Sequence, residues 1–327
     1  MRPTPESVHV NTPLTMISLA YMQAAEDFVA DKAFPVIPVD KQSDVYYEFD
    51  RASMNRNQMK KRAPATKANG GIYTVSNDSY RCDVFALRQD IPDQVRKNAD
   101  SVLNVDAAAA QFLAQQALIN REVSFATDFL TTGVWGTDIT GVASGAVAGT
   151  SVLQWNDGGS TPIENMRAGK QAIKLATGQK ANKLILGEPV WNQIADHPDF
   201  LDRVKGAATP SSPAMVLRQA LASILELDEV LVMGAIQNTA DEGQTATNAW
   251  IGGKVALLLH TPQSPGLMTP SAGYTFAWRG YLGGTLPVAI ERYRVQEIKS
   301  DVVEIEAAYD QKKTGQYLGY FFDSIVA

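Results

Sequence analysis

The stretch from Asp106 to Leu130 contains neither glycine nor proline, and its start includes four successive alanines. Alanine is the best helix former, whereas glycine and proline interrupt helices. The sequence therefore predicts one long helix, a rod that would span roughly 40 Å at about 1.5 Å per residue. Because this rod exceeds the ordinary globular helix, it limits what the remaining chain can build around it.

Both ends of the predicted rod carry boundary signals. Ile91-Pro92-Asp93 is typical of a helix start, because proline fits the first helical turn. Asn104 or Asp106 favours a fresh start, which would leave a separate short helix over 93–103. Thr131-Thr132-Gly133 predicts the end, with glycine just beyond the last turn.

Apolar residues recur along the rod at seven-residue steps, and a second set falls four residues later. The resulting seam contains Val105, Phe112, Ile119, Val123 and Leu130. Such a stripe is typical of a helix that buries one face. It does not distinguish a core helix of an α/β enzyme from a spine that carries separate lobes.

Composition indicates a folded chain and excludes several classes of protein. The 327 residues suffice for one large domain or two ordinary ones, and 45% are hydrophobic. A net charge of −6 disfavours a dedicated nucleic-acid binder. The single cysteine, Cys82, fits a reducing compartment, and its strand-like surroundings favour a buried structural thiol over a nucleophile. No apolar run reaches the ~20 residues of a membrane span, and we expect no secretory signal.

An arm and a long β excursion precede the rod. Residues 1–34 begin with prolines and continue into an expected amphipathic helix over 14–29, which needs a surface of its own domain or of a neighbour. Strand-like residues follow over 35–50 and return over 72–87. Between them, 51–71 carries six basic residues and no acidic one. Because an isolated hairpin is marginal in water, we expect this excursion to rest on another surface.

The second half of the chain has α/β character and then becomes β again. Short buried strands are expected at 183–187, 229–234 and 255–259, with helices between them. Two long strands are expected over 286–309, joined at Lys299-Ser300-Asp301, and an aromatic run at 317–325 closes the chain.

A search for catalytic chemistry finds no convincing constellation. His9, His197 and His260 lack the spacing of a metal site, and His197 is expected to be structural. No nucleotide-binding motif is present, and Asp241-Glu242 is expected to be a solvated loop. We therefore predict no catalytic residue, no cofactor and no metal.

The order of these parts resembles the major capsid proteins of tailed bacteriophages, which have the HK97-like fold. The second half carries the most specific matches, each a pattern rather than a catalytic signature. These are Trp155-Asn156-Asp157, Thr177-Gly178, Ala181 to Gly187, Trp191, His197-Pro198, Val232-Met233-Gly234, Trp250-Ile251-Gly252, Leu257-Leu258-Leu259 and Tyr274 to Trp278.

The resemblance implies an α+β fold with five consecutive segments. These are an N-terminal arm (1–34), an extended loop or E-loop (35–90), a peripheral domain with the spine helix (91–149), an α/β axial domain (150–285) and a β return to the peripheral domain (286–327). The rod would then pack its seam on the β return. Arg121, Glu122 and Asp128 would face outward or toward a neighbour.

The resemblance also implies a structural protein rather than an enzyme. Subunits would form pentamers and hexamers that close into the icosahedral head shell of the virion around double-stranded DNA, without sequence-specific binding and without a membrane. Basic side chains at the E-loop tip would pair with acidic groups on an adjacent subunit: Arg56, Lys60, Lys61, Arg62 and Lys67. The hairpin at Lys299, Ser300 and Asp301 would lie where capsomers meet.

Further expectations concern partners and chemistry. Some relatives cross-link an E-loop lysine to a peripheral asparagine, but the last asparagine here is Asn248, so we expect no such cross-link. No helical scaffolding extension precedes the arm, so we expect a separate scaffolding protein, together with a portal and a possible decoration protein. Assembly is expected in the host cytoplasm. The alternatives are an encapsulin-like compartment with an enzyme cargo and a two-lobed cytoplasmic enzyme.

Overall fold

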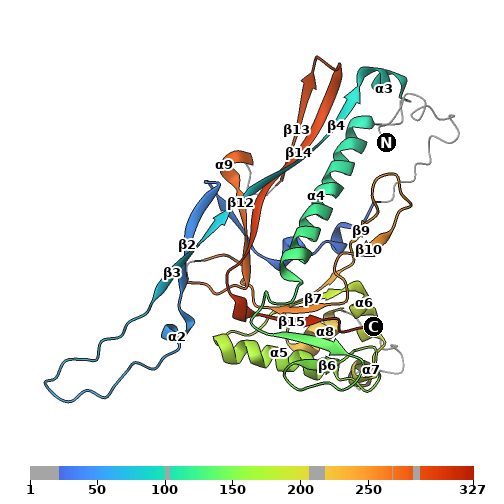
Figure 1. Ribbon diagram of the computed structural model, residues 1–327. Helices are drawn as coiled ribbons and strands as arrows, with labels where there is room; N and C mark the ends of the chain where they lie inside the picture. Colours follow the sequence, from blue (N-terminus) through green and yellow to red (C-terminus); the bar gives the residue numbers. More distant parts are fainter. Residues whose placement is uncertain (1–21, 100–103, 206–217, 267, 283–287) are drawn as a thin grey trace.

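The computed structural model describes residues 22–99, 104–205, 218–266, 268–282 and 288–327. Figure 1 shows an elongated upper part built on the helix α4, an α/β lobe at its lower end, and a hairpin that projects to one side. Two sheets form the body, one in each part, and the helix α4 runs along the upper sheet.

The lower lobe is a six-stranded mixed sheet with the strand order β6-β5-β15-β11-β7-β8. Its strands are β5 (Asp138–Val142), β6 (Ser151–Leu153), β7 (Lys183–Gly187), β8 (Glu229–Met233), β11 (Ala256–Leu259) and β15 (Gly319–Asp323). Its helices are α5 (Pro162–Thr177), α6 (Glu188–Ala195), α7 (Pro198–Lys205) and α8 (Arg218–Leu225). The three strands expected from short apolar runs, β7, β8 and β11, are confirmed. Such runs are typical of strands that are buried on both faces.

The upper sheet has five strands, four of them in the order β1-β12-β14-β13, with β4 pairing to the upper part of β14. These strands are β1 (Val36–Val39), β4 (Asp83–Pro92), β12 (Gly273–Trp278), β13 (Val288–Val295) and β14 (Ser300–Lys313). The 14-residue β14 pairs with β13 and β4 in its first part and with β12 in its last part.

Short elements complete the described chain. They are η1 (Ala25–Asp27), α1 (Ala30–Ala33), the hairpin β2 (Ser43–Phe49) and β3 (Val75–Arg81), α2 (Arg51–Met54), α3 (Asp93–Asn98), the hairpin β9 (Ile236–Asn238) and β10 (Asn248–Trp250), α9 (Arg279–Leu282) and η2 (Gln316–Leu318). The helix expected over 14–29 lies largely outside the described residues. Its described end is not α-helical, because Phe28 is extended between η1 and α1.

The rod is α4 (Val105–Phe129), and the predicted fresh start is confirmed. The Asn104 side-chain oxygen accepts a hydrogen bond from the Ala107 N–H at 3.1 Å, which caps the first turn. The separate α3 precedes it. The predicted end was too late, because the helix stops at Phe129, four residues before Gly133.

The predicted seam of the rod was partly wrong. The buried side chains of α4 are Ala109, Leu113, Arg121, Phe125 and Phe129, spaced by four or eight residues, together with Glu122. Phe112 is 51% exposed, whereas Arg121 and Glu122 are 7% and 1% exposed. The upper half packs on Val303 and Ile305 of β14, as expected, but the lower half joins the large core of the α/β lobe.

The two sheets do not divide the chain at the predicted segment boundaries. β12 precedes residue 285 but belongs to the upper sheet, where it pairs with β14. β15 follows residue 286 but lies inside the lower sheet, between β11 and β5. Both departures from the predicted boundaries follow from the length of β14. This strand runs from the upper end of the molecule down to the lower lobe, so β12 pairs with its last part and β15, which follows it, joins the lower sheet.

Candidate functional site

The β2–β3 hairpin is anchored at its base through one face. Tyr46 and Tyr80 stack on Phe276 of β12, with ring centroids 5.7 and 4.4 Å apart. Side chains alternate between the two faces of a strand pair. This face is therefore the one that holds the hairpin to its own subunit.

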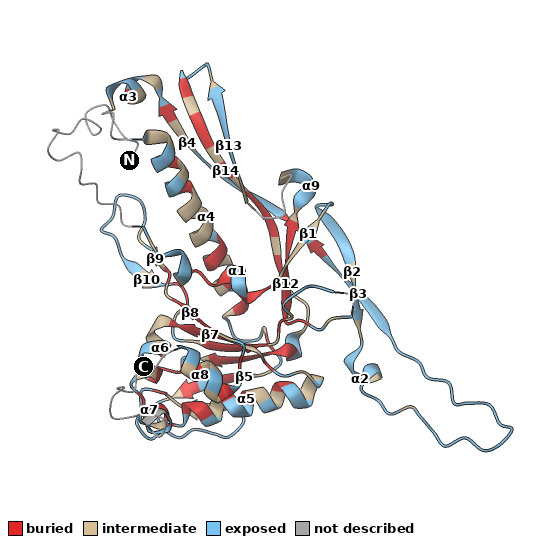
Figure 2. Cartoon of the chain, turned by 180° about the vertical axis from the view of Figure 1, so that it is seen from behind, coloured by how far each residue is buried: buried red, intermediate tan, exposed pale blue. Residues whose placement is uncertain are grey.

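The other face of the hairpin has no cover within the described part of the chain. Val45, Tyr47 and Val75 are 53%, 71% and 45% exposed. Beyond the strands, Ile72 and Tyr73 are 79% and 60% exposed. Figure 2 shows both strands and the loop beyond them as exposed along almost their whole length. A contiguous apolar stripe of this kind marks an interaction surface.

The helix α2 fixes the point where the basic loop begins. The Asp50 carboxylate caps it by accepting bonds from the Ala52 and Ser53 N–H groups at 3.1 and 2.9 Å. A further bond from the Ser53 hydroxyl, together with these N–H groups, holds the pKa of Asp50 below its usual range. Arg51 places its guanidinium 3.9 Å from the centre of the Tyr317 ring and donates to the Ala176 carbonyl at 2.8 Å. This joins the loop to the end of α5, where the helix dipole favours a cation.

Gln58 gives local order to the loop beyond α2. Its amide donates to the Ile72 carbonyl and accepts from the Ile72 N–H, both at 2.9 Å. The Asn69 amide donates to the Gln58 carbonyl at 2.9 Å. These bonds tie the two sides of the loop together at its neck.

The predicted basic tip is exposed, and all its members except Arg56 lie beyond that neck. Its members are Arg56, Lys60, Lys61, Arg62 and Lys67. Within the described residues none of them forms an ion pair, although the Arg62 Nε donates to the Thr66 carbonyl. The structure thus brings these five residues onto one loop and gives their charges no acidic partner among the residues it describes.

The upper sheet carries an acidic stripe on the face opposite α4, which sequence reasoning missed. Glu291 of β13 stands directly opposite Glu304 of β14, and Glu306 lies two residues further along. Like charges in directly opposite positions destabilise a strand pair. Glu304 accepts a 2.6 Å bond from the Tyr293 hydroxyl, and no ion pair forms at these three glutamates among the described residues. The alternation of glutamates with apolar residues over 302–306 could have indicated an acidic face. Nothing in the sequence indicated that Glu291 would pair opposite Glu304.

The predicted inter-capsomer hairpin is displaced from its expected position. The turn between β13 and β14 consists of Gln296 to Lys299, and Lys299 has a left-handed φ of 46°. Ser300 is only 2% exposed and already belongs to β14, where it pairs with Val295. The exposed tip is therefore 296–299, and of the three predicted residues only Lys299 is part of it.

Asp301, the third predicted residue, lies in a network of ion pairs. It accepts bonds from Arg96, from Arg292 at 3.2 Å and from Arg294 at 3.1 Å. Arg294 also pairs with Asp93 at 2.6 Å. Bonds from Arg294 hold the pKa values of Asp301 and Asp93 below their usual range. The network links α3, β13 and β14, and thereby braces the turn at 296–299.

Two residues weighed as possible catalytic groups are structural. The His197 Nδ1 accepts the Asp199 N–H at 3.2 Å, so Nε2 carries the proton and cannot act as a base toward the Ser160 hydroxyl 3.1 Å away. The Cys82 thiol is buried, and this burial raises its pKa to about 12, which disfavours the thiolate. The predicted burial of Cys82 is confirmed.

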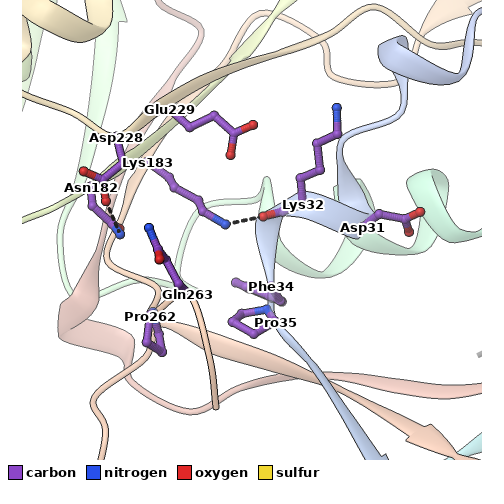
Figure 3. A pocket seen from close by; sticks show the side chains of 10 residues that line it. All are labelled: Asp31, Lys32, Phe34, Pro35, Asn182, Lys183, Asp228, Glu229, Pro262 and Gln263. Atoms are coloured by element: carbon purple, nitrogen blue, oxygen red, sulfur yellow. Dashed lines mark hydrogen bonds between the residues drawn. The ribbon is translucent and has the colours of Figure 1, made fainter. Parts of the chain in front are cut away.

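The described residues offer no metal site, and one of their pockets has a lining of mixed charge. No group of three or more His, Cys, Asp or Glu side chains in the described ranges could hold a metal ion. Nor does any helix in this part of the chain combine the length and the apolar character of a membrane span. A cavity of about 550 Å³ lies between α1 and the starts of β7 and β8 (Figure 3). Lys183 crosses it to donate to the Lys32 carbonyl, and carboxylates of Asp228 and Glu229 line it.

Comparisons with known proteins agree with this geometry. The chain is 23% identical over 325 residues to the major capsid protein of Burkholderia phage BcepMu, covering 97% of this chain and 96% of that protein. It is 22% identical over 318 residues to the major capsid protein of Pseudomonas phage JBD67, covering 97% of each. No family model matches the chain.

Solved structures show the same fold. A phage-related protein from Bordetella bronchiseptica RB50 matches with a TM-score of 0.65 and 19% identity, covering 93% of this chain and 94% of that one. A chain of the cyanophage P-SCSP1u capsid matches with a TM-score of 0.57 and 10% identity, covering 94% and 90%. The chain is therefore a homologue of phage major capsid proteins, and it has the HK97-like fold that the sequence resemblance implied.

Proposed function

We propose that this chain is the major head subunit of a tailed phage. Its copies assemble as pentamers and hexamers into an icosahedral shell that encloses double-stranded DNA. The observation that carries the proposal is the full-length similarity to major capsid proteins together with the uncovered hairpin over 43–81. A subunit that functions alone has no use for a long excursion whose apolar face is open to water.

The hairpin and its loop act as the E-loop and lie over an adjacent subunit. Burial of the exposed Val45, Tyr47 and Val75 against that neighbour supplies an apolar contact. The tip, residues 56–67, then reaches acidic groups of the neighbour. The stripe of Glu291, Glu304 and Glu306 is the acidic surface that suits it best, because these carboxylates form no ion pair among the described residues, although Arg88 of β4 stands opposite Glu304.

The turn at 296–299 is the contact between capsomers. It stands at the far end of the upper sheet (Figure 1), and the ion-pair network of Asp301 holds it in place. This role belongs to the four exposed residues of the turn, of which Glu297 and Lys299 are charged.

The proposed role as a head subunit also implies DNA, a scaffolding protein, a portal and a decoration protein as partners. The net charge of −6 suits a container that encloses DNA without binding it by sequence. A separate scaffolding protein directs assembly in the host cytoplasm, a portal occupies one vertex, and a decoration protein can bind outside. The finished subunit resides in the virion capsid and needs neither cofactor nor membrane.

Electron microscopy and size-exclusion chromatography of the purified full-length chain test the proposal. Shells, or capsomers of high mass, are the expected result, with packaged DNA rather than an enzyme inside particles from infected cells. A stable monomer of 35.4 kDa under all conditions, with and without a scaffolding protein, would contradict the proposal.

The subunits are expected to assemble without covalent cross-links. The β13–β14 region contains no asparagine, and the last one in the chain is Asn248. Intact particles boiled in SDS should therefore give a single monomer band on a denaturing gel. A ladder of covalent oligomers that persists under reducing conditions would show that this expectation is wrong.

A further inference from the structure

The N-terminal segment 22–34 is held to both halves of the molecule. Gln23 exchanges two hydrogen bonds with the backbone of Ile236 at the start of β9, each 2.8 Å long. The ammonium group of Lys183 in β7 donates to the carbonyl of Lys32. These contacts attach the segment to the β9–β10 hairpin and to the lower lobe, and Lys32 and Lys183 both line the cavity of about 550 Å³ (Figure 3).

The segment also enters the core beside the rod. Phe34 packs edge-on against Phe125 and Phe129 of α4, with ring centroids 5.3 and 4.9 Å apart. All three rings are buried. The segment therefore crosses from the lower lobe to α4 and fixes one against the other.

A buried glutamate makes the polar contact between the segment and the rod. The Val29 N–H lies 2.9 and 3.0 Å from the two carboxylate oxygens of Glu122, and the Ala30 N–H lies 2.8 Å from Oε2. Glu122 is 1% exposed. Its carboxylate thus satisfies two backbone donors of the segment in a region from which water is excluded.

The charges around Glu122 do not neutralise it by a direct ion pair. Arg121, its neighbour on α4, pairs with Asp31 of the segment instead. Tyr309 of β14 acts on Arg121 and accepts from the Asn120 amide at 3.3 Å, and no ion pair joins Glu122 to a residue of the described structure. A buried carboxylate without a paired cation favours its protonated form.

We propose that Glu122 is a proton-dependent clasp that positions the segment 22–34 on α4. When the segment is docked, Glu122 is buried and holds a proton more readily than when the segment is detached and the carboxyl is solvated. A proton on Oε1 leaves Oε2 free to accept from both Val29 and Ala30. Proton uptake therefore strengthens docking, and proton release weakens it.

The direction and window of this effect follow from the two states. Burial raises the pKa of Glu122 from 4.5 to about 7, against the opposing effects of the Ala30 and Val29 N–H groups and of Arg121. Docking is strongest below about pH 4.5, weakens by at most about tenfold per pH unit as the pH rises toward 7, and then levels off. This inference concerns the single subunit and does not depend on shell assembly.

Hydrogen–deuterium exchange of the full-length chain tests the clasp. Protection of peptides from 22–34 is compared between wild type and Glu122→Gln at each pH from 5 to 8, which cancels the intrinsic pH dependence of exchange. Glutamine keeps the acceptor but has no charge to release. The matched control is Asp128→Asn, an exposed carboxyl on the same helix.

The wild-type protection, divided by that of Glu122→Gln, should fall at least tenfold from pH 5 to pH 7 and then stay constant. Asp128→Asn should follow wild type, and peptides from α5 should be unaffected. A ratio that does not change with pH would overturn the proposal. If Glu122→Gln fails to fold, the ratio of 22–34 to α5 protection within wild type gives the same test, and its constancy would overturn the proposal equally.

Discussion

The lower lobe and the upper sheet are both β-rich, yet they differ in how completely they bury themselves. In the lower sheet, all four residues of β11 are 0% exposed. In the upper sheet, most of β4 is exposed, and so are most residues of the separate β2–β3 hairpin. Figure 2 shows this contrast between the buried strands below and the exposed hairpin at the side.

Side chains buried within the subunit stabilise its fold, whereas exposed surfaces are available for contacts between subunits. The strand β11 reads as a continuous apolar run, which is typical of a strand covered on both sides. In β2, by contrast, only Tyr46 and Phe49 are half-buried, so most of its side chains contribute little to the stability of the subunit. The lower lobe therefore carries most of the free energy of folding, and the open surfaces are left for other molecules.

The largest effect on stability is expected in the lower sheet. Leu257→Ala removes a fully buried side chain from the centre of that sheet and should lower the free energy of unfolding by about 2–5 kcal/mol. Chemical denaturation of the subunit measures this. Leu175→Ala is the matched control, because Leu175 is 91% exposed and its loss should change stability by less than about 0.5 kcal/mol. Equal losses of unfolding free energy in the two variants would contradict the proposed difference in stability between buried and exposed regions.

A smaller effect is expected at the braced end of the upper sheet. Asp301→Asn removes the charge shared by Arg96, Arg292 and Arg294, so unfolding should become easier. Because the pKa of Asp301 is lowered in the folded subunit, its contribution is fully present above its ordinary value of 3.8 and is lost as the pH falls through the folded value.

Thermal unfolding of Asp301→Asn and wild type at pH 7 and pH 3 tests this sign. The difference between the two proteins should shrink at the lower pH. Asp241→Asn, on the exposed loop between β9 and β10, serves as the control and should show no difference at either pH. A difference that grows toward low pH would contradict the role of the ionised Asp301.

The contact at the base of the loop should matter less again. Arg51→Ala removes the guanidinium over Tyr317 and should cost about 0.5–1 kcal/mol, the range of an exposed cation–π contact. Arg56→Ala, five residues further along and without an ion pair in the described structure, should change stability negligibly. Urea unfolding monitored by tryptophan fluorescence compares the two, and an equal loss for both would show that Arg51 does not dock the loop.

The smallest effect on the subunit should accompany the largest effect on assembly. Replacing the five tip residues Arg56, Lys60, Lys61, Arg62 and Lys67 by glutamine should leave the free energy of unfolding within about 0.5 kcal/mol. Shell yield in light scattering should nevertheless fall sharply. Wild-type assembly should also weaken with added salt, which screens exposed charges.

A charge exchange sharpens this last comparison. Glu291→Lys with Glu304→Lys and Glu306→Lys should also abolish assembly, and glutamate at the five tip positions should restore it in that background. Restoration would identify the stripe as the surface that receives the tip. Full assembly of the glutamine tip variant would instead show that its charges are dispensable.

The sequence predicted the elements better than their partners. The absence of glycine and proline, together with Asn104, was sufficient to place α4, because these signals act within one turn. The assignment of Glu122 to the surface was wrong, because the backbone donors that satisfy its carboxylate come from residues 29 and 30. Nothing near Glu122 in the sequence indicates that contact.

Strand partners were equally beyond local reasoning. The aromatic run over 317–325 was recognised, but its insertion between β11 and β5 depends on the path of the preceding strand. The turn at 296–299 was displaced because Lys299-Ser300-Asp301 is polar enough to resemble a loop, whereas Asp301 is polar because it binds three arginines. The basic tip was identified correctly as a loop because its charges meet no such partners.

The length of β14 has a mechanical consequence. Its 14 residues extend roughly 46 Å at about 3.3 Å per residue, and hydrogen-bonded neighbours flank it along most of that length. A force applied at the 296–299 turn along this strand acts on many backbone hydrogen bonds in parallel. The strand is therefore a stiff element that transmits tension between neighbouring subunits to β12. Through the 3₁₀ turn η2, the same tension reaches β15 at the centre of the lower sheet.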